Sequence, residues 1–113
     1  MFTSHEVQTR IATIASREFT ISLMRLSNGC FAVVTEGRKP KLGSIVLAVK
    51  AGGRASSSAV LASRQDVSFS KMIAELLADR LNGIALVSAF MEAELGPEGV
   101  RQLLTEVDSL ARG

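Results

Sequence analysis

The feature that most constrains the fold of this chain is a pair of adjacent apolar segments, residues 69–81 and 84–91. In the first segment the apolar residues recur at spacings of three and four, which places them on one face of a helix. The second segment is apolar at nearly every position, so a strand formed by it needs cover on both faces. An Asn-Gly pair at residues 82–83 favours a helix end between the two segments. We therefore predict a helix, capped by Ser68 or Ser70, that leads into a central strand.

The first half of the chain shows the alternation of apolar and polar residues that is typical of strands. Residues 18–26 and 30–35 alternate clearly, and the Asn-Gly pair between them favours a tight hairpin turn. Residues 7–14 form a weaker candidate strand, whereas residues 45–49 are apolar on both faces. We interpret these segments as an antiparallel meander.

The remaining segments complete an α+β order of strands, a helix, a strand and a helix. Residues 51–58 are rich in glycine and serine and are interpreted as a flexible loop, followed by a short strand at residues 59–62. A phosphate cradle at residues 52–54 is disfavoured, because the G-x-x-x-x-G-K-[ST] and G-x-G-x-x-G spacings are absent. Pro97 and Glu98 suit the first turn of a last helix. The apolar stripe of that helix consists of Val100, Leu103, Leu104, Val107 and Leu110.

The composition limits what the chain can do. Its 113 residues can bury one core, so residues 1–113 are expected to form a single domain. One cysteine and one histidine are too few for a metal site built from these residues, and no acid–base pair stands out at a useful spacing. With no tryptophan or tyrosine and only 5 phenylalanines, the chain is poorly supplied with aromatic residues that could stack on bases. We therefore expect no catalytic residue, metal, cofactor or nucleic-acid partner.

The N-terminal residues show no secretory signal, and the longest apolar stretch is far shorter than the ~20 residues of a membrane-spanning helix. Cys30 lies in an apolar strand pattern and is expected to pack as a small hydrophobic residue, which fits a reducing compartment. We expect no membrane association and a cytoplasmic location, and in a eukaryote a nuclear one as well.

The charged residues are unevenly distributed, although the net charge is only +2. Residues 1–64 carry nine basic and three acidic side chains, whereas residues 65–113 carry four basic and eight acidic ones. Part of the basic excess, Arg38, Lys39 and Lys41, falls in a proline-containing connection. These three side chains are either ordinary solvated loop charges or a basic edge that steers an acidic partner.

Three stretches of the chain resemble the proteasome assembly chaperone 4 family, whose members pair with proteasome assembly chaperone 3. Residues 20–26 (TISLMRL), a polar turn and residues 31–34 (FAVV) are similar to the first hairpin of that family. Residues 42–49 (LGSIVLAV) are similar to its next strand. Residues 56–61 (SSSAVL), the helix and residues 84–88 (IALVS) are similar to its serine-rich segment, helix and Val-Ser strand.

The resemblance covers roughly residues 18–112 and implies both a fold and a function. The implied fold is an antiparallel sheet of about six strands with two α-helices on one face. The implied function is that of a non-enzymatic chaperone for assembly of the 20S proteasome α-ring, acting as a homodimer or as a heterodimer with a proteasome assembly chaperone 3-like subunit. The chain departs from the family where Val33 and Val34 replace an aromatic residue, and it lacks the hydrophobic-Tyr-X tail of other proteasome-binding chaperones.

The basic connection has two interpretations under this resemblance. Arg38, Lys39 and Lys41 are candidates for meeting an acidic surface on a proteasome α subunit, although the α subunit is left open. The alternative function is a small α+β ligand-binding or nucleic-acid-binding domain that uses the basic loops.

The sheet itself supplies a second candidate contact. With both helices on one face, the other face is left apolar and uncovered, so we expect a second subunit to pack on it. Small residues let two sheets approach closely, and for this reason Ala85, Val87 and Ala89 are the predicted interface. The alternative set on the same strand is Ile84, Leu86 and Phe90.

Overall fold

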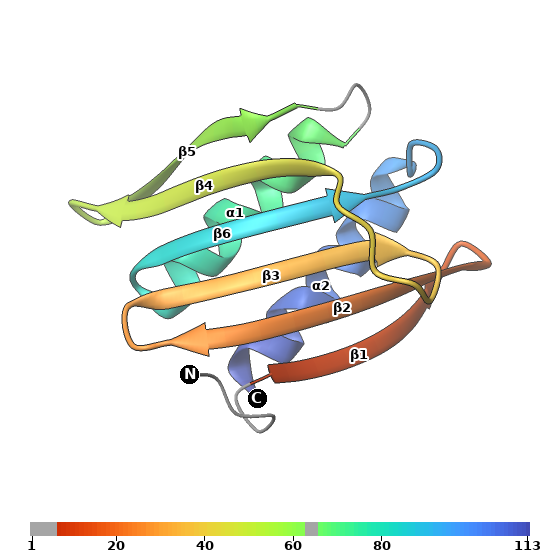
Figure 1. The fold of residues 1–113 in the computed structure, drawn as a ribbon, viewed down its shortest axis with the longest axis horizontal. Helices are drawn as coiled ribbons and strands as arrows, with labels where there is room; N and C mark the ends of the chain where they lie inside the picture. The colour runs from red at the N-terminus through yellow and green to blue at the C-terminus, as the bar shows by residue number, and fades with distance from the viewer. Residues whose placement is uncertain (1–6, 63–65) are drawn as a thin grey trace.

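The computed structural model describes residues 7–62 and 66–113, which form one β-sheet with both helices packed on the same face (Figure 1). The elements in chain order are β1 (Val7–Ile14), β2 (Arg17–Leu26), β3 (Gly29–Glu36), β4 (Ser44–Ala51), β5 (Arg54–Leu61), α1 (Val67–Leu81), β6 (Ile84–Phe90) and α2 (Pro97–Arg112). Across the sheet the strands are ordered β1-β2-β3-β6-β4-β5. The predicted α+β fold, with six strands and two helices on one face, is confirmed.

The sheet is mixed rather than purely antiparallel, because β6 lies between β3 and β4 and runs parallel to β3. The pairs β1–β2 and β2–β3 are antiparallel as predicted, but β4 does not continue the meander beside β3. Insertion of β6 gives this strongly apolar strand a neighbour on each side. At the start of β6 the backbones of β3 and β6 approach closely. This approach depends on Gly29, where a Cβ atom would lie 1.8 Å from the carbonyl oxygen of Ile84.

Strands β4 and β5 form an antiparallel hairpin, so the interpretation of residues 51–58 as a flexible loop is wrong. Gly52 and Gly53 form the turn with φ angles of 62° and 83°, which lie in the left-handed region that favours glycine. The turn therefore explains both glycines without a bound phosphate. Alanine and serine dominate β5, and few of its residues are of the β-branched or aromatic types that mark strands.

Helix α1 begins after Asp66, and neither Ser68 nor Ser70 caps it. Asp66 is 1% exposed, and its carboxylate accepts hydrogen bonds from the Ser44 hydroxyl (2.9 Å) and the Met91 backbone N–H (3.2 Å). The Ser70 hydroxyl donates to the Ser44 carbonyl oxygen (3.2 Å). These bonds join the start of α1 to the start of β4 and the end of β6.

The core lies between the helices and the face of the sheet that they cover. Buried residues of α1, among them Phe69, Ile73 and Leu77, lie over β4 and β6, while α2 packs against β1 and β2. The predicted end of α1 is confirmed, because Asn82 caps it in the left-handed conformation with φ of 55°. Within the described residues, neither helix combines the length and the hydropathy that crossing a membrane requires.

Candidate protein-binding site

The face of the sheet opposite the helices, here called the open face, carries a continuous set of large apolar side chains. At its centre Leu47 of β4 pairs with Leu86 of β6, which in turn pairs with Phe31 of β3. Leu47 is 39% exposed, and the paired residues Val49 and Ile84 are 40% exposed each. A contiguous apolar area of this kind is uncommon on a monomer and marks a binding surface. The large apolar residues of the open face are Val7, Ile11, Met24, Leu26, Phe31, Val33, Ile45, Leu47, Val49, Leu61, Ile84, Leu86 and Phe90.

Charged side chains are scarce on the open face. Hydroxyl groups lie between the apolar residues instead, such as those of Thr9 and Ser22, whose oxygen atoms are 3.3 Å apart. In the described strands, the register places charged residues on this side only at Glu18, near the start of β2, and at Arg54, the first residue of β5. A charge-poor apolar centre is the composition that protein–protein interfaces show in their buried core.

Three basic residues of the strands, Arg10, Arg25 and Lys50, are directed to the helices. Arg10 of β1 pairs with Glu106 of α2 (3.2 Å), and Lys50 of β4 pairs with Asp79 of α1 (3.0 Å). Arg25 of β2 donates to a carbonyl oxygen in the last turn of α2 (3.1 Å). Arg10 and Lys50 of the basic first half of the sequence therefore pair with acidic residues of its second half within the molecule.

The predicted interface residues Ala85, Val87 and Ala89 lie on the covered face of β6. Each is 0% exposed, within the core that the sheet forms with α1 and α2. The prediction that they contact a partner is wrong, because elements of the same chain already cover them. The alternative set Ile84, Leu86 and Phe90 lies on the open face.

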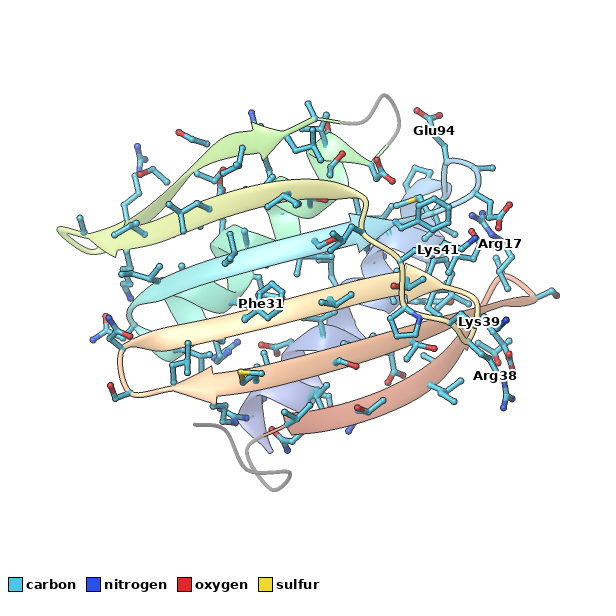
Figure 2. The ribbon with its side chains drawn as sticks, in the orientation of Figure 1. Arg17, Phe31, Arg38, Lys39, Lys41 and Glu94 are labelled. Carbon is cyan, nitrogen blue, oxygen red and sulfur yellow. The ribbon has the colours of Figure 1, made fainter. Side chains whose placement is uncertain are left out.

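The loop of residues 37–43 passes over the end of the open face, and its three basic side chains have different surroundings (Figure 2). Arg38 makes two hydrogen bonds to Glu18 (2.9 and 3.0 Å), which lower the pKa of the Glu18 carboxyl. The Lys41 ammonium lies 5.0 Å from the centre of the Phe90 ring, in a cation–π arrangement. Lys39 is exposed. Because the charge of Arg38 is already engaged, Lys39 and Lys41 are the better candidates for contacting a partner.

At the same end of the sheet, Arg17 forms a clamp that sequence reasoning missed (Figure 2). Its guanidinium binds both carboxylate oxygens of Glu36 (2.7 and 2.9 Å) and the carbonyl oxygens of Ala93 (2.7 Å) and Glu94 (3.3 Å). The hydrogen bond from Arg17 lowers the pKa of Glu36, although burial of the carboxyl opposes this. The clamp joins the start of β2 to the connection between β6 and α2. Its members are 19 to 77 positions apart in sequence, so no local pattern indicates it.

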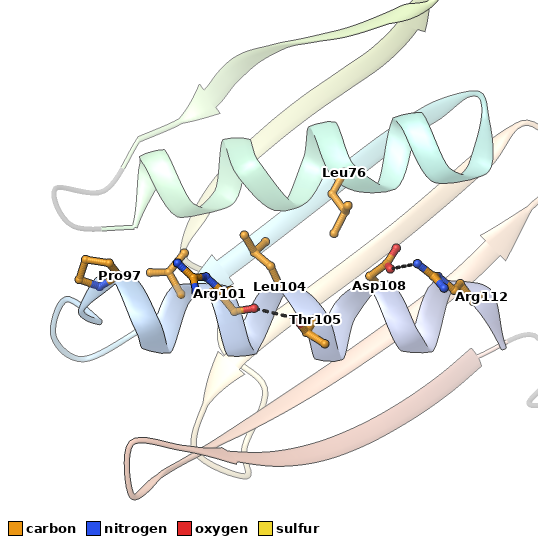
Figure 3. A pocket seen from close by; sticks show the side chains of 8 residues that line it. Leu76, Pro97, Arg101, Leu104, Thr105, Asp108 and Arg112 are labelled. Carbon is orange, nitrogen blue, oxygen red and sulfur yellow. Dashed lines mark hydrogen bonds and ion pairs between the residues drawn. The ribbon is translucent and has the colours of Figure 1, made fainter.

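On the other side of the molecule, α1 and α2 enclose an open groove of about 570 Å³ (Figure 3). Leu76 and Leu104 line its middle, and Asp108 bridges the helices by binding Arg80 (2.7 Å) and Arg112 (2.9 Å). The lining residues include no histidine or cysteine. Among the described residues, no group of three or more histidine, cysteine, aspartate or glutamate side chains could hold a metal ion.

A solved structure shares this fold. It is described as the crystal structure of a novel chaperone complex for yeast 20S proteasome assembly, and the match has a TM-score of 0.59. The match covers 92% of this chain and 91% of that chain, at 15% sequence identity. No protein-family model and no curated protein matches the sequence. At this identity the likeness establishes the fold, which resembles that of a proteasome assembly chaperone.

Proposed function

We propose that this chain is a non-enzymatic, cytoplasmic chaperone subunit, similar to proteasome assembly chaperone 4, that assists assembly of the α-ring of the 20S proteasome. The observation that carries the proposal is the open face, because a six-stranded sheet with one uncovered apolar face is built for a protein partner. The likeness in fold to a chain of a yeast proteasome-assembly chaperone complex also supports this proposal.

The open face is proposed to bind a second subunit, either a second copy of this chain or a proteasome assembly chaperone 3-like subunit. Two such sheets packed face to face would bury on the order of 1,000 Å² or more in total, which is enough for a stable interface. Leu86 of β6 would then lie near the centre of the interface, with Ile84 and Phe90 at the two ends of the same strand. The helices of both subunits would lie on the outside of the sandwich.

The loop of residues 37–43 is proposed to help meet an acidic surface on a proteasome α subunit. Lys39 and Lys41 carry this role, since Arg38 is engaged by Glu18. Charges at the rim of an interface act mainly on the association rate and on its salt dependence. Reversal of both lysine charges should therefore slow association at low ionic strength, and an unchanged rate would remove the lysines from the proposal.

Co-expression of the tagged chain with the α subunits of its own source tests the function. At least one α subunit should co-purify with the chain as a stoichiometric complex, before and without formation of complete proteasomes. Recovery of nucleic acid or ribosomes, with no α subunit bound, would overturn the proposal in favour of a nucleic-acid-binding domain.

A further inference from the structure

Buried hydroxyl groups of the sheet form hydrogen bonds with the backbone of the loop of residues 37–43. The Thr20 hydroxyl donates to the carbonyl oxygen of Gly37 at the start of the loop (2.7 Å). In the second half of the loop, the backbone N–H of Lys41 donates to the Thr35 hydroxyl oxygen (3.1 Å), and the Thr35 hydroxyl also lies within 3.3 Å of the Lys41 carbonyl oxygen. Both ends of this basic segment are thus tied to side chains of β2 and β3.

Two further contacts complete the attachment. The backbone N–H of Gly43 donates to the Ser88 hydroxyl oxygen of β6 (3.0 Å), where the chain enters β4. The paired hydrogen bonds from Arg38 to Glu18 tie the outer bend of the loop to β2. Three strands therefore position one short loop.

The burial of these hydroxyl groups indicates that they serve to position the loop. Thr35 and Ser88 are each 1% exposed, and they are hydroxyl residues in the mostly apolar central strands β3 and β6. A buried hydroxyl group is unfavourable unless it is hydrogen-bonded, and valine or alanine would pack at these positions without needing a partner. The hydroxyl groups thus couple the conformation of the loop to the folded sheet, and little conformational entropy is left for the loop to lose on binding.

The loop exposes a large apolar side chain to solvent. Leu42 is 68% exposed, the highest value among the large apolar residues that the structure describes. Val60 and Leu61, which are 66% and 55% exposed, lie at the same end of the sheet, because Leu61 pairs with Ile45 just beyond the loop. Lys39 adds an exposed positive charge on the loop.

We propose that residues 37–43 form a preorganised recognition loop, in which Leu42 is the apolar anchor, Lys39 supplies the charge, and Thr35 and Ser88 are positioning residues. The partner that fits it is a folded protein surface that presents an apolar side chain beside a carboxylate. This inference rests on the proposed function, in which that surface belongs to a proteasome α subunit. The loop binds this client at the rim of the sheet, and the open face remains available for the second subunit.

Hydrogen exchange on the purified chain tests the positioning role. Thr35→Val removes the hydroxyl group at nearly constant volume, and it should raise the exchange rate of the Lys41 amide at least tenfold while the amides of β3 and β6 stay protected. Thr35→Ser retains the hydroxyl group and should restore protection. Ser88→Ala gives a second, independent variant for the Gly43 amide. Unchanged exchange in both Thr35→Val and Ser88→Ala would show that the hydroxyl groups do not position the loop.

Binding to the α subunit that co-purifies with the wild-type chain tests recognition. Leu42→Ser should weaken the complex about tenfold or more, and Thr35→Val should weaken it without altering any contact residue. Because both changes act through one loop, the double variant should bind no worse than Leu42→Ser alone. Wild-type affinity of Leu42→Ser, or full additivity of the two changes, would overturn the inference. Failure of the wild-type chain to bind any α subunit would instead overturn the proposed function.

Discussion

Leu86 and Val87 are consecutive residues of β6 whose side chains lie on opposite faces of the sheet, so they form a matched test of which face is internal. Val87 is 0% exposed within the helix-covered core, whereas Leu86 lies half-buried on the open face. Val87→Glu places a carboxylate in the core, while Leu86→Glu places the same group beside water. We expect Val87→Glu to unfold the chain and Leu86→Glu to leave it folded.

The expected losses in the free energy of unfolding follow from the burial of each residue. Loss of a fully buried valine removes about 1.5–3 kcal/mol of apolar stabilisation. An unpaired carboxylate held in the core costs several kcal/mol more, or forces the group to stay protonated. A domain of 113 residues has a total free energy of unfolding of roughly 6–17 kcal/mol. Val87→Glu therefore removes most or all of the stability, Val87→Ala about 2 kcal/mol, and Leu86→Glu less than about 1 kcal/mol.

Urea unfolding followed by circular dichroism measures these differences, and sedimentation velocity reports the state of association. Leu86→Glu should sediment as a folded monomer under conditions in which the wild-type complex is intact. A folded Val87→Glu protein of wild-type stability would refute the assignment of the covered face. A Leu86→Glu protein that still binds its second subunit with unchanged affinity would show that the open face is not the interface.

Three further measurements test other parts of the structure. Because the hydrogen bond from Arg17 lowers the pKa of Glu36, this pair contributes stability above the ordinary pKa of 4.5 that is lost as the pH falls through the lowered value. The urea midpoint of the wild-type chain should thus fall more steeply below pH 4.5 than that of Glu36→Gln, and parallel curves would contradict the clamp. Gly43→Ala would place a Cβ atom 2.0 Å from the Ala89 carbonyl oxygen and should lower the free energy of unfolding by about 1–3 kcal/mol in a urea titration, whereas no loss would mean that β4 and β6 lie further apart. Burial raises the pKa of Cys30 to about 11, so iodoacetamide at pH 8 should modify it only after unfolding, and rapid modification of the native chain would show that β3 is accessible.

Apolar periodicity predicts most of the individual elements, because burial selects the residue at each position along a helix or strand. The side-chain directions inferred for β2 and β3, with Phe19 and Ile21 on the face opposite Ser22, and with Ala32 opposite Val33, agree with the observed burial. The missed strand β5 is an exposed edge strand of small residues, which carries little apolar signal.

The arrangement of the elements was harder to predict, since it depends on partners far apart in sequence. The Asn-Gly turn indicates that β2 pairs with β3, but nothing local indicates that β6 returns to lie between β3 and β4. The same limit applies to Asp66, whose carboxylate binds Ser44 and Met91 at separations of 22 and 25 positions. The local sequence indicates Ser68 or Ser70 as the helix cap, because serine is a preferred residue at the start of a helix.

The sequence predicts an apolar face for a partner, but the residues predicted to form it lie on the helix-covered face of the sheet. A strand that is apolar on both faces implies two covers, and the two helices of this chain cover the same face, so one uncovered apolar face could be inferred. The choice between the faces rested on the size of the residues at positions 85–89. Residues 85, 87 and 89 do form a close-packed face, but α1 of the same chain packs on it instead of a second sheet.

The distribution of residue size between the two faces explains why the helices take one and leave the other. On the covered face the central strands carry small residues, such as Ala32, Ala48 and Ala85, each no more than 1% exposed, and α1 contributes Ala74 and Ala78 at 0%. Small residues on both sides let the backbone of α1 approach the sheet closely, so α1 covers the central strands β4 and β6 while α2 covers β1 and β2. The same strands place Phe31, Leu47, Ile84, Leu86 and Phe90 on the open face. Large side chains expose more area to water and need a broad partner surface to bury them. The alternation of small and large apolar residues along β3, β4 and β6 therefore builds the core of the chain on one side, and on the other it leaves the large apolar side chains that we propose a second subunit covers.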